Sequence, residues 1–210
     1  MNNTPLSRRD FLKGLVLAAG ASILVSCVPA GSSQSTGALP TQDAAQQPSP
    51  GRALNFLIAY DSVYGNTKQI AESLIEAVDS EHETKLLHAG EASFADLENV
   101  DLVIIGSPTH GGTFTDQIKT FIANLPAKSL EGVKAAAFDT GFERDVQTNF
   151  MKKVIDVFGY ASPKIAKKLE NKGAEVIGAK TFLVLDTEGP LKEGEIDRAK
   201  TWLLDLLKTV

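Results

Sequence analysis

Apolar residues between positions 52 and 210 recur in two alternating patterns, short runs and helically spaced stripes. The short runs predict five strands, at residues 53–60, 84–89, 100–106, 133–138 and 175–185. The stripes predict helices at residues 68–78, 118–125, 146–158, 162–173 and 196–207, with a weaker helical link at 93–99. Strands that alternate with helices form an open, doubly wound parallel sheet, so we predict an α/β fold with five parallel strands.

The fourth of these helices carries its own start and stop signals. Ser162 is a favourable cap residue, Pro163 fits a first helical turn, and Gly173 is typical of a position just beyond a helix end. We therefore expect Ser162 to cap this helix.

The loop between the first strand and the first helix has the composition of a phosphate-binding loop. Backbone N–H groups turn inward in such loops, and the helix N-terminus adds its dipole. Ser62 and Thr67 can add hydroxyl groups, while Gly65 permits backbone conformations that other residues resist. The loop lacks the lysine of GxxxxGK[ST] and the spaced glycines of GxGxxG, which favours one terminal phosphate over ATP, GTP or a dinucleotide. The alternative is that Ser62 and Thr67 only cap the helix.

Two further loops of similar composition follow the third and fourth strands. Residues 107–113 contain two adjacent glycines, and residues 139–142 combine an acid, a hydroxyl, a glycine and an aromatic ring. Ligands of open α/β sheets bind beyond the carboxyl ends of the strands. Three loops at one edge therefore strengthen the prediction of a binding site there.

Composition restricts the chemistry that this site can use. The formal charge of −5 argues against a nucleic-acid partner, because phosphate contacts need clustered Lys and Arg. A single cysteine, Cys27, allows no internal disulfide or metal–thiolate cluster, and the three histidines lack metal-ligand spacing. Redox chemistry would therefore need a bound organic cofactor.

The first 27 residues have the features of an export signal. Ser7–Lys13 closely matches the twin-arginine export pattern, and the apolar run that follows, Gly14–Ser26, is too short to cross a membrane but normal for a signal peptide. Leu24–Cys27 resembles a lipobox, in which the cysteine is lipidated and becomes the new N-terminus. The alternative is an accidental cysteine at the end of an ordinary signal.

Residues 28–51 are small, polar and rich in proline, and no periodicity is present. Such a segment is expected to be a flexible linker. A coil of this length spans about 25–30 Å, enough to hold a domain just off a membrane. We therefore divide the chain into a twin-arginine lipoprotein signal peptide (1–27), a linker (28–51) and one folded domain (52–210).

The loops together resemble those of the flavodoxin family. Residues 62–67 match the family's [ST]-x-T-G-x-T phosphate loop, except that Tyr64 replaces the usual Thr. Residues 106–112 resemble its second loop, 137–140 the start of its third, and 188–195 a segment common in flavodoxin-like proteins. The resemblance implies strand order 2-1-3-4-5 and flavin mononucleotide (FMN) at the switch point. It carries over the following FMN-binding residues: Ser62, Val63, Tyr64, Gly65, Asn66, Thr67, Pro108, Thr109, His110, Gly111, Gly112, Asp139, Thr140, Gly141 and Phe142.

Several of these residues also have plainer interpretations. His110 and Phe142 stand where the family places aromatic residues over the flavin, but they could be a solvated histidine and a core phenylalanine. Gly111 and Gly112 fit the peptide that approaches flavin N5, or a plain turn. Asp139 would keep this edge of the site negative, or serve ordinary turn chemistry.

The resemblance implies an FMN-binding electron carrier, held outside the cytoplasmic membrane by a lipid on Cys27. We expect a monomer that exchanges electrons with redox protein partners. The alternative is an enzyme, an NAD(P)H-dependent quinone or nitro-compound reductase, because Tyr60–Gly65 also resembles the first loop of those reductases. Soluble NAD(P)H is not expected outside the cytoplasmic membrane, which favours the carrier. A third possibility is a binding-only protein that has lost its flavin.

Overall fold

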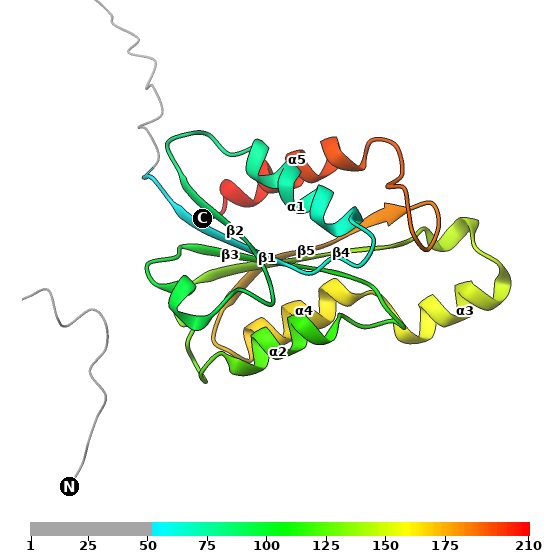
Figure 1. Ribbon diagram of the computed structural model, residues 1–210, viewed down its shortest axis with the longest axis horizontal. Coiled ribbons are helices and arrows are strands. Elements are labelled where there is room, and N and C mark those ends of the chain that lie inside the picture. Colours follow the sequence, from blue (N-terminus) through cyan, green and yellow to red (C-terminus); the bar gives the residue numbers. More distant parts are fainter. Residues whose placement is uncertain (1–51) are drawn as a thin grey trace, which may run out of the picture. The chain divides into compact units, whose positions relative to one another are not determined.

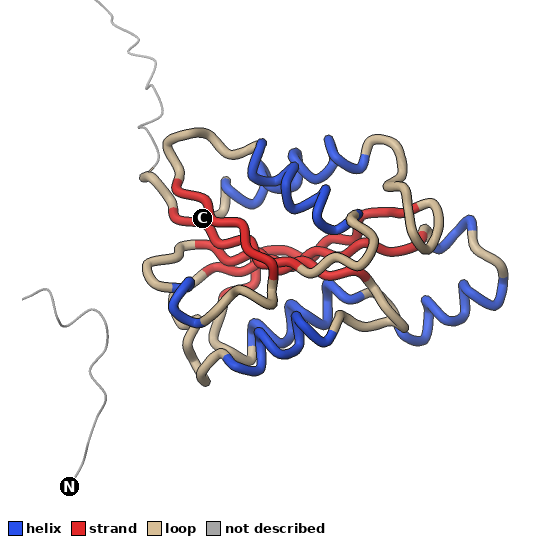
Figure 2. Tube along the Cα trace, in the orientation of Figure 1, coloured by secondary structure: helices blue, strands red, loops and turns tan. Residues whose placement is uncertain are grey.

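A five-stranded parallel sheet organises residues 52–210, the part of the chain that the computed structural model describes (Figure 1). The expected signal peptide, the linker and Cys27 lie outside the described residues. Helices cover both faces of the sheet, as Figure 2 shows. The elements are β1 (Asn55–Tyr60), α1 (Asn66–Glu76), β2 (Glu83–His88), η1 (Phe94–Leu97), β3 (Leu102–Pro108), α2 (Asp116–Asn124), β4 (Lys134–Phe142), η2 (Arg144–Val146), α3 (Asn149–Phe158), α4 (Ala161–Glu170), β5 (Glu175–Val184) and α5 (Glu195–Leu207).

The strand order is β2-β1-β3-β4-β5, and every neighbouring pair is parallel. This confirms the predicted α/β class and the order that the family resemblance implies. The register sets Tyr60 opposite Gly106, and Ser107 opposite Asp139. The loops after β1, β3 and β4 therefore leave the sheet at the same edge.

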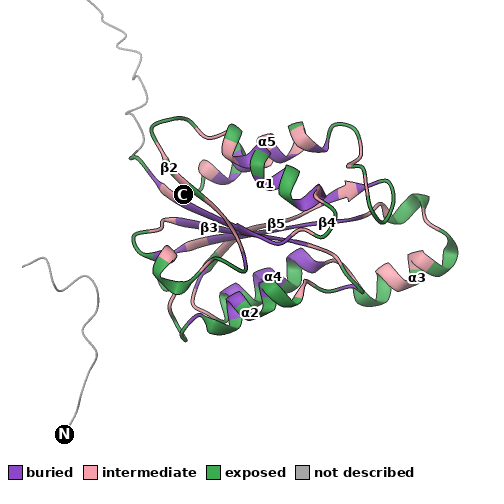
Figure 3. Ribbon diagram, viewed as in Figure 1, coloured by how far each residue is buried: buried purple, intermediate pink, exposed green. Residues whose placement is uncertain are grey.

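Two hydrophobic clusters hold the helices to the sheet, one on each face (Figure 3). Successive residues of β1 alternate between them: Leu57 packs toward α2 and α4, whereas Ile58 packs toward α1 and α5. Both side chains are almost completely buried, which contributes about 1.5–3 kcal/mol each. The continuous apolar run in the sequence reflects this burial on both sides.

The helix predicted at 146–158 begins only at Asn149, and two boundary predictions near the site are also wrong. The fourth strand does not end at Phe138: β4 continues through residues 139–142, because β3 and β5 supply pairing partners along that stretch. Ser162 does not cap α4; the helix begins at Ala161 with Tyr160 in the cap position. Pro163 does lie in the first turn, as predicted. Among the described residues, none of the helices has the length and apolar character needed to cross a membrane.

Candidate functional site

A cleft opens at the edge of the sheet where the three loops meet. It brings together most of the FMN-binding residues predicted from the sequence, and it adds two residues from the end of β5 and the loop that follows. The lining residues are Val63, Tyr64, Asn66, Thr67, Pro108, Thr109, His110, Gly111, Thr140, Gly141, Phe142, Val184 and Thr187.

Four nominated residues do not line this cleft: Ser62, Gly65, Gly112 and Asp139. Ser62 and Gly65 belong to the phosphate loop, where Ser62 accepts from the Lys68 N–H and Gly65 is the N-cap of α1. Gly112 is buried against α3, and Asp139 is buried within the sheet.

Val184 and Thr187 were missed by the sequence interpretation. The predicted fifth strand ends at residue 185, and a parallel β5 must end at the same edge as its neighbours. That register rule was the signal that could have identified both residues.

The phosphate loop presents a row of free backbone donors. Gly65 occupies the N-cap position of α1 with φ +87° and ψ −15°, a left-handed conformation that glycine adopts without strain. Within residues 52–210, the hydrogen bonds leave the N–H groups of residues 63–67 without an acceptor. A turn followed by a helix N-terminus directs such donors toward one anion, which the helix dipole also favours.

The two hydroxyls of this loop have different surroundings. Ser62 Oγ accepts a hydrogen bond from the Lys68 N–H at 3.2 Å, so it satisfies one amide of the first helical turn. Thr67 is only 1% exposed, and its Oγ1 lies 2.9 Å from Oγ1 of Thr140. This contact ties the phosphate loop to the end of β4.

Ring-shaped side chains form the mouth of the cleft. Tyr64 is 45% exposed in the first loop, His110 is exposed in the second, and Phe142 is half-buried at the end of β4. The second loop is held by mutual hydrogen bonds between the backbones of His110 and Thr113, at 2.8 and 3.0 Å. Gly111, at φ +55°, has no heavy atom within 4 Å of the place where a Cβ would stand. These walls offer flat, largely apolar surfaces to a planar ligand.

Asp139 lies beneath the second loop, fully buried. Its carboxylate accepts hydrogen bonds from Thr109 Oγ1 at 2.5 Å, Thr181 Oγ1 at 2.9 Å and the Ser162 N–H at 3.2 Å. Burial raises the pKa of Asp139, and these hydrogen bonds oppose part of that rise. Thr109 Oγ1 in turn accepts from the Ala161 N–H at 2.9 Å. Asp139 thereby fixes a cleft-lining threonine and the start of α4.

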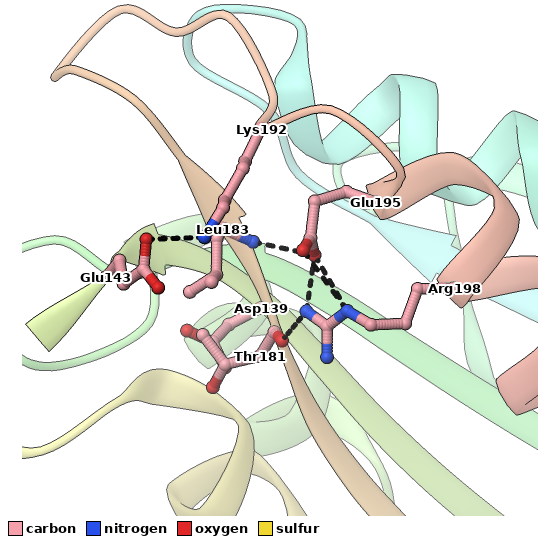
Figure 4. Close-up of polar contacts among 7 residues, drawn as sticks. All are labelled: Asp139, Glu143, Thr181, Leu183, Lys192, Glu195 and Arg198. Atoms are coloured by element: carbon pink, nitrogen blue, oxygen red, sulfur yellow. Dashed lines mark hydrogen bonds and ion pairs between the residues drawn. The ribbon is translucent and has the colours of Figure 1, made fainter. Parts of the chain in front are cut away.

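A polar network holds the loop between β5 and α5 (Figure 4). Lys192 contacts Glu143 at 2.6 Å, which joins this loop to the segment after β4. Glu195 accepts from the Leu183 N–H at 2.9 Å and pairs with Arg198, whose guanidinium also donates to the Thr181 carbonyl at 2.6 Å.

The same loop reaches back to the phosphate loop through one side-chain amide. Asn66 Nδ2 donates to the Glu188 carbonyl at 3.0 Å. Gly189 packs so closely on Asn66 that an added Cβ would stand 2.5 Å from Asn66 Oδ1. The loop after β5 therefore supports the first helical turn of α1.

Comparison with known proteins identifies the same family that the loops resemble. A family model described as Flavodoxin matches residues 58–202, more than half of the chain. A flavodoxin of Aquifex aeolicus is 33% identical over 89 residues, which is 40% of this chain and 48% of that protein. The matched segment thus spans about half the length of this curated relative.

Solved structures extend the likeness over the folded domain. Oxidised flavodoxin 2 from Bacillus cereus is 25% identical and covers 74% of this chain and 99% of its own, with a TM-score of 0.57. Oxidised flavodoxin 1 from the same species is 18% identical over the same shares, with a TM-score of 0.58. A flavodoxin, WrbA-like protein of Agrobacterium tumefaciens is 18% identical, covers 75% and 97%, and has a TM-score of 0.53. At these identities the two latter structures demonstrate a shared fold.

Proposed function

We propose that this chain, which belongs to the flavodoxin family, carries electrons by means of FMN held in the cleft at the carboxyl edge of its sheet. FMN is the cofactor of this family. The observation that carries the proposal is the row of five N–H groups at residues 63–67 that have no acceptor within the described part of the chain.

These donors fit the phosphate of FMN. A dianion needs several donors aimed at one point, and hydrogen bonds to a charged group contribute about 1.5–3 kcal/mol each. Gly65 gives the loop the left-handed turn that directs them, and Thr67 anchors the loop to Thr140. The loop contains no lysine or arginine between residues 61 and 67, so the amides would carry most of the attraction.

The walls of the cleft fit the planar ring system. Tyr64 and Phe142 would cover it, and His110 would stand at its exposed side. The peptide between Gly111 and Gly112 has no Cβ on either side, so its carbonyl can turn toward the ring. When bound, FMN supplies the one-electron chemistry. The side chains need only bind the cofactor, orient it and exclude water from its faces.

We further propose that the carrier works outside the cytoplasmic membrane, attached by a lipid on Cys27. The support is the twin-arginine pattern, the lipobox-like Leu24–Cys27 and the polar linker of residues 28–51. Export of a folded protein that already contains its cofactor gives a reason to use the twin-arginine route. The partners would be redox proteins that accept or donate single electrons, and the carrier would act as a monomer.

Two measurements test these proposals. Protein purified without added flavin should show flavin absorbance bands and release FMN on denaturation; a colourless preparation that does not take up added FMN would contradict the cofactor assignment. The holo-protein should not oxidise NADPH in the presence of a quinone, and sustained turnover would favour the reductase instead.

The attachment is tested separately by fractionating cells. The wild-type chain should sediment with membranes, and Cys27→Ser should release it. Equal distribution of the two chains would contradict lipid attachment at this cysteine.

A further inference from the structure

Helix α3 carries an apolar stripe that the rest of the described chain covers only in part. None of its residues is fully buried, and it lies beyond the end of α4 (Figures 1 and 3). Phe150 and Val157 are each 74% exposed, and Phe158 is 52% exposed. With Val154 they occupy positions i, i+4, i+7 and i+8, so the four side chains form one stripe along the helix. We call these four residues the apolar stripe.

Two interactions nevertheless stabilise α3 in this position. Thr148 caps it, accepting a hydrogen bond from the Met151 N–H at 3.3 Å. Arg144 in η2 binds both carboxylate oxygens of Asp156, at 2.5 and 2.7 Å. A capped helix clamped by a bidentate ion pair is a formed element whose apolar stripe faces outward.

A groove between α2 and α4 collects positive charge on an otherwise acidic protein. Its residues are Thr113, Phe114, Asp116, Lys119, Lys164, Lys167, Lys168 and Asn171. Lys167 pairs with Glu170 at 2.8 Å, whereas no carboxylate of residues 52–210 forms an ion pair with the other three lysines. We call this set the basic groove. Asp116 is its one acidic member.

The stripe and the groove meet at Gly112. A Cβ at Gly112 would stand 2.3 Å from Cβ of Phe158, so the stripe ends against this glycine. The Lys164 ammonium donates to the Gly112 carbonyl. Figure 1 places α2, α3 and α4 on one side of the sheet, with α1 and α5 on the other. The two features therefore adjoin at Gly112, on the same side of the sheet, and we treat them together as one surface.

We propose that this surface lies on an anionic lipid bilayer. The apolar stripe inserts among the lipid headgroups, and the lysines of the basic groove face the anionic headgroups at the membrane surface. An interfacial helix combines phenylalanines on one side with lysines on another, and Lys152 and Lys153 supply the latter on α3. Each lysine near an anionic membrane adds to the attraction.

The inference rests on the proposed lipid attachment for its choice of partner. The expected linker of 24 residues after Cys27 would keep the domain within about 25–30 Å of the bilayer, so the bilayer would be present at high effective concentration. A free protein partner has no such advantage. Insertion of α3 would bring the cleft close to the membrane surface, because Gly112 borders both the stripe and the second cleft loop.

A photo-crosslinking experiment tests this orientation in the full chain. The crosslinking residue p-benzoyl-L-phenylalanine replaces Phe150 in one variant and Leu204 in the control. Leu204 is 49% exposed on α5, on the opposite side of the sheet. After irradiation of membranes, the site-150 chain should carry phospholipid adducts, detected by mass, and the site-204 chain should carry far fewer.

Charge reversal supplies an independent readout. In the site-150 chain, Lys119→Glu with Lys168→Glu should lower the lipid-adduct yield by up to about fivefold for each lysine charge removed. The matched control, Lys200→Glu with Lys208→Glu on α5, makes the same change in net charge and should leave the yield unaltered.

The possible failures are distinguishable. Recovery of the chain only in the soluble fraction would overturn the lipid attachment and this inference with it. Membrane-bound protein with equal lipid adducts at sites 150 and 204 would overturn the inference alone. So would site-150 adducts consisting of another protein or of a second copy, which would identify the surface as a protein interface.

Discussion

The left-handed turn at Gly65 offers the sharpest test of how the phosphate loop works. Alanine at this position would meet no atom within 4 Å, so the substitution adds no clash and acts only through the backbone. A left-handed conformation costs a residue with a Cβ about 1–2 kcal/mol. We expect the loop of the Gly65→Ala variant to relax toward negative φ in the free protein, whereas binding the phosphate requires the original turn. The strain therefore weakens binding, and the Kd for FMN should rise about 5–30-fold.

Gly194 provides a matched control. It is the N-cap of α5 with φ +84° and ψ −6°, close to the values at Gly65, and it too has open space around the Cβ position. Gly194→Ala should lower Tm by a few degrees, at about 2–4 °C per kcal/mol for a domain of this size, without changing FMN affinity. Fluorescence titration of the apo-proteins with FMN measures both values of Kd. Equal affinities for the Gly65→Ala and Gly194→Ala variants would refute the role assigned to the loop.

Two further predictions address other parts of the site. Because burial raises the pKa of Asp139, its contribution to the free energy of unfolding falls as pH rises from 3.8 through the folded-state pKa. The free energy of unfolding of Asp139→Asn, relative to wild type, should therefore increase with pH. Urea titrations at several pH values measure this difference, and a difference that does not change with pH would contradict the prediction. Glu195→Gln should lower the free energy of unfolding by about 1–3 kcal/mol, because it removes the charge from the pair with Arg198. Glu175→Gln, in an exposed pair with Lys134, should lower it by less than about 1 kcal/mol. Equal losses for the two variants in thermal unfolding would contradict the larger contribution of the Glu195–Arg198 pair.

The sequence predicted the architecture because alternating apolar patterns depend on neighbours in the chain. The first strand and helix and the shared edge of three loops could be inferred from such local signals. The order 2-1-3-4-5 came from the family resemblance, because periodicity alone does not determine which strands pair.

The errors arose where distant residues decide the outcome. Aspartate is common in turns, so Asp139 was expected to follow the strand. Its carboxylate instead accepts hydrogen bonds from Thr109, Thr181 and the Ser162 N–H, and β4 continues through it. The same contact occupies the amide of Ser162, which lies inside α4 and not at its cap. Partners separated by 23 to 42 positions leave no local signal in a single sequence.

The apolar stripe on α3 shows a different limit. Its spacing correctly predicted a helix, but the same spacing usually indicates a face buried in the core. Whether a core surface is available depends on the position of the neighbouring elements. Here α3 lies beyond the end of α4, and Phe150 and Val157 remain exposed.

The central claim is that the amides of residues 63–67 hold the phosphate of the cofactor, and riboflavin tests it most directly. Riboflavin has the same ring system and ribityl chain as FMN but lacks the phosphate. Titration of the apo-protein with each flavin should give a Kd for riboflavin at least about 100-fold weaker, since hydrogen bonds to a charged phosphate contribute about 1.5–3 kcal/mol each. Equal affinity for the two flavins would contradict the account.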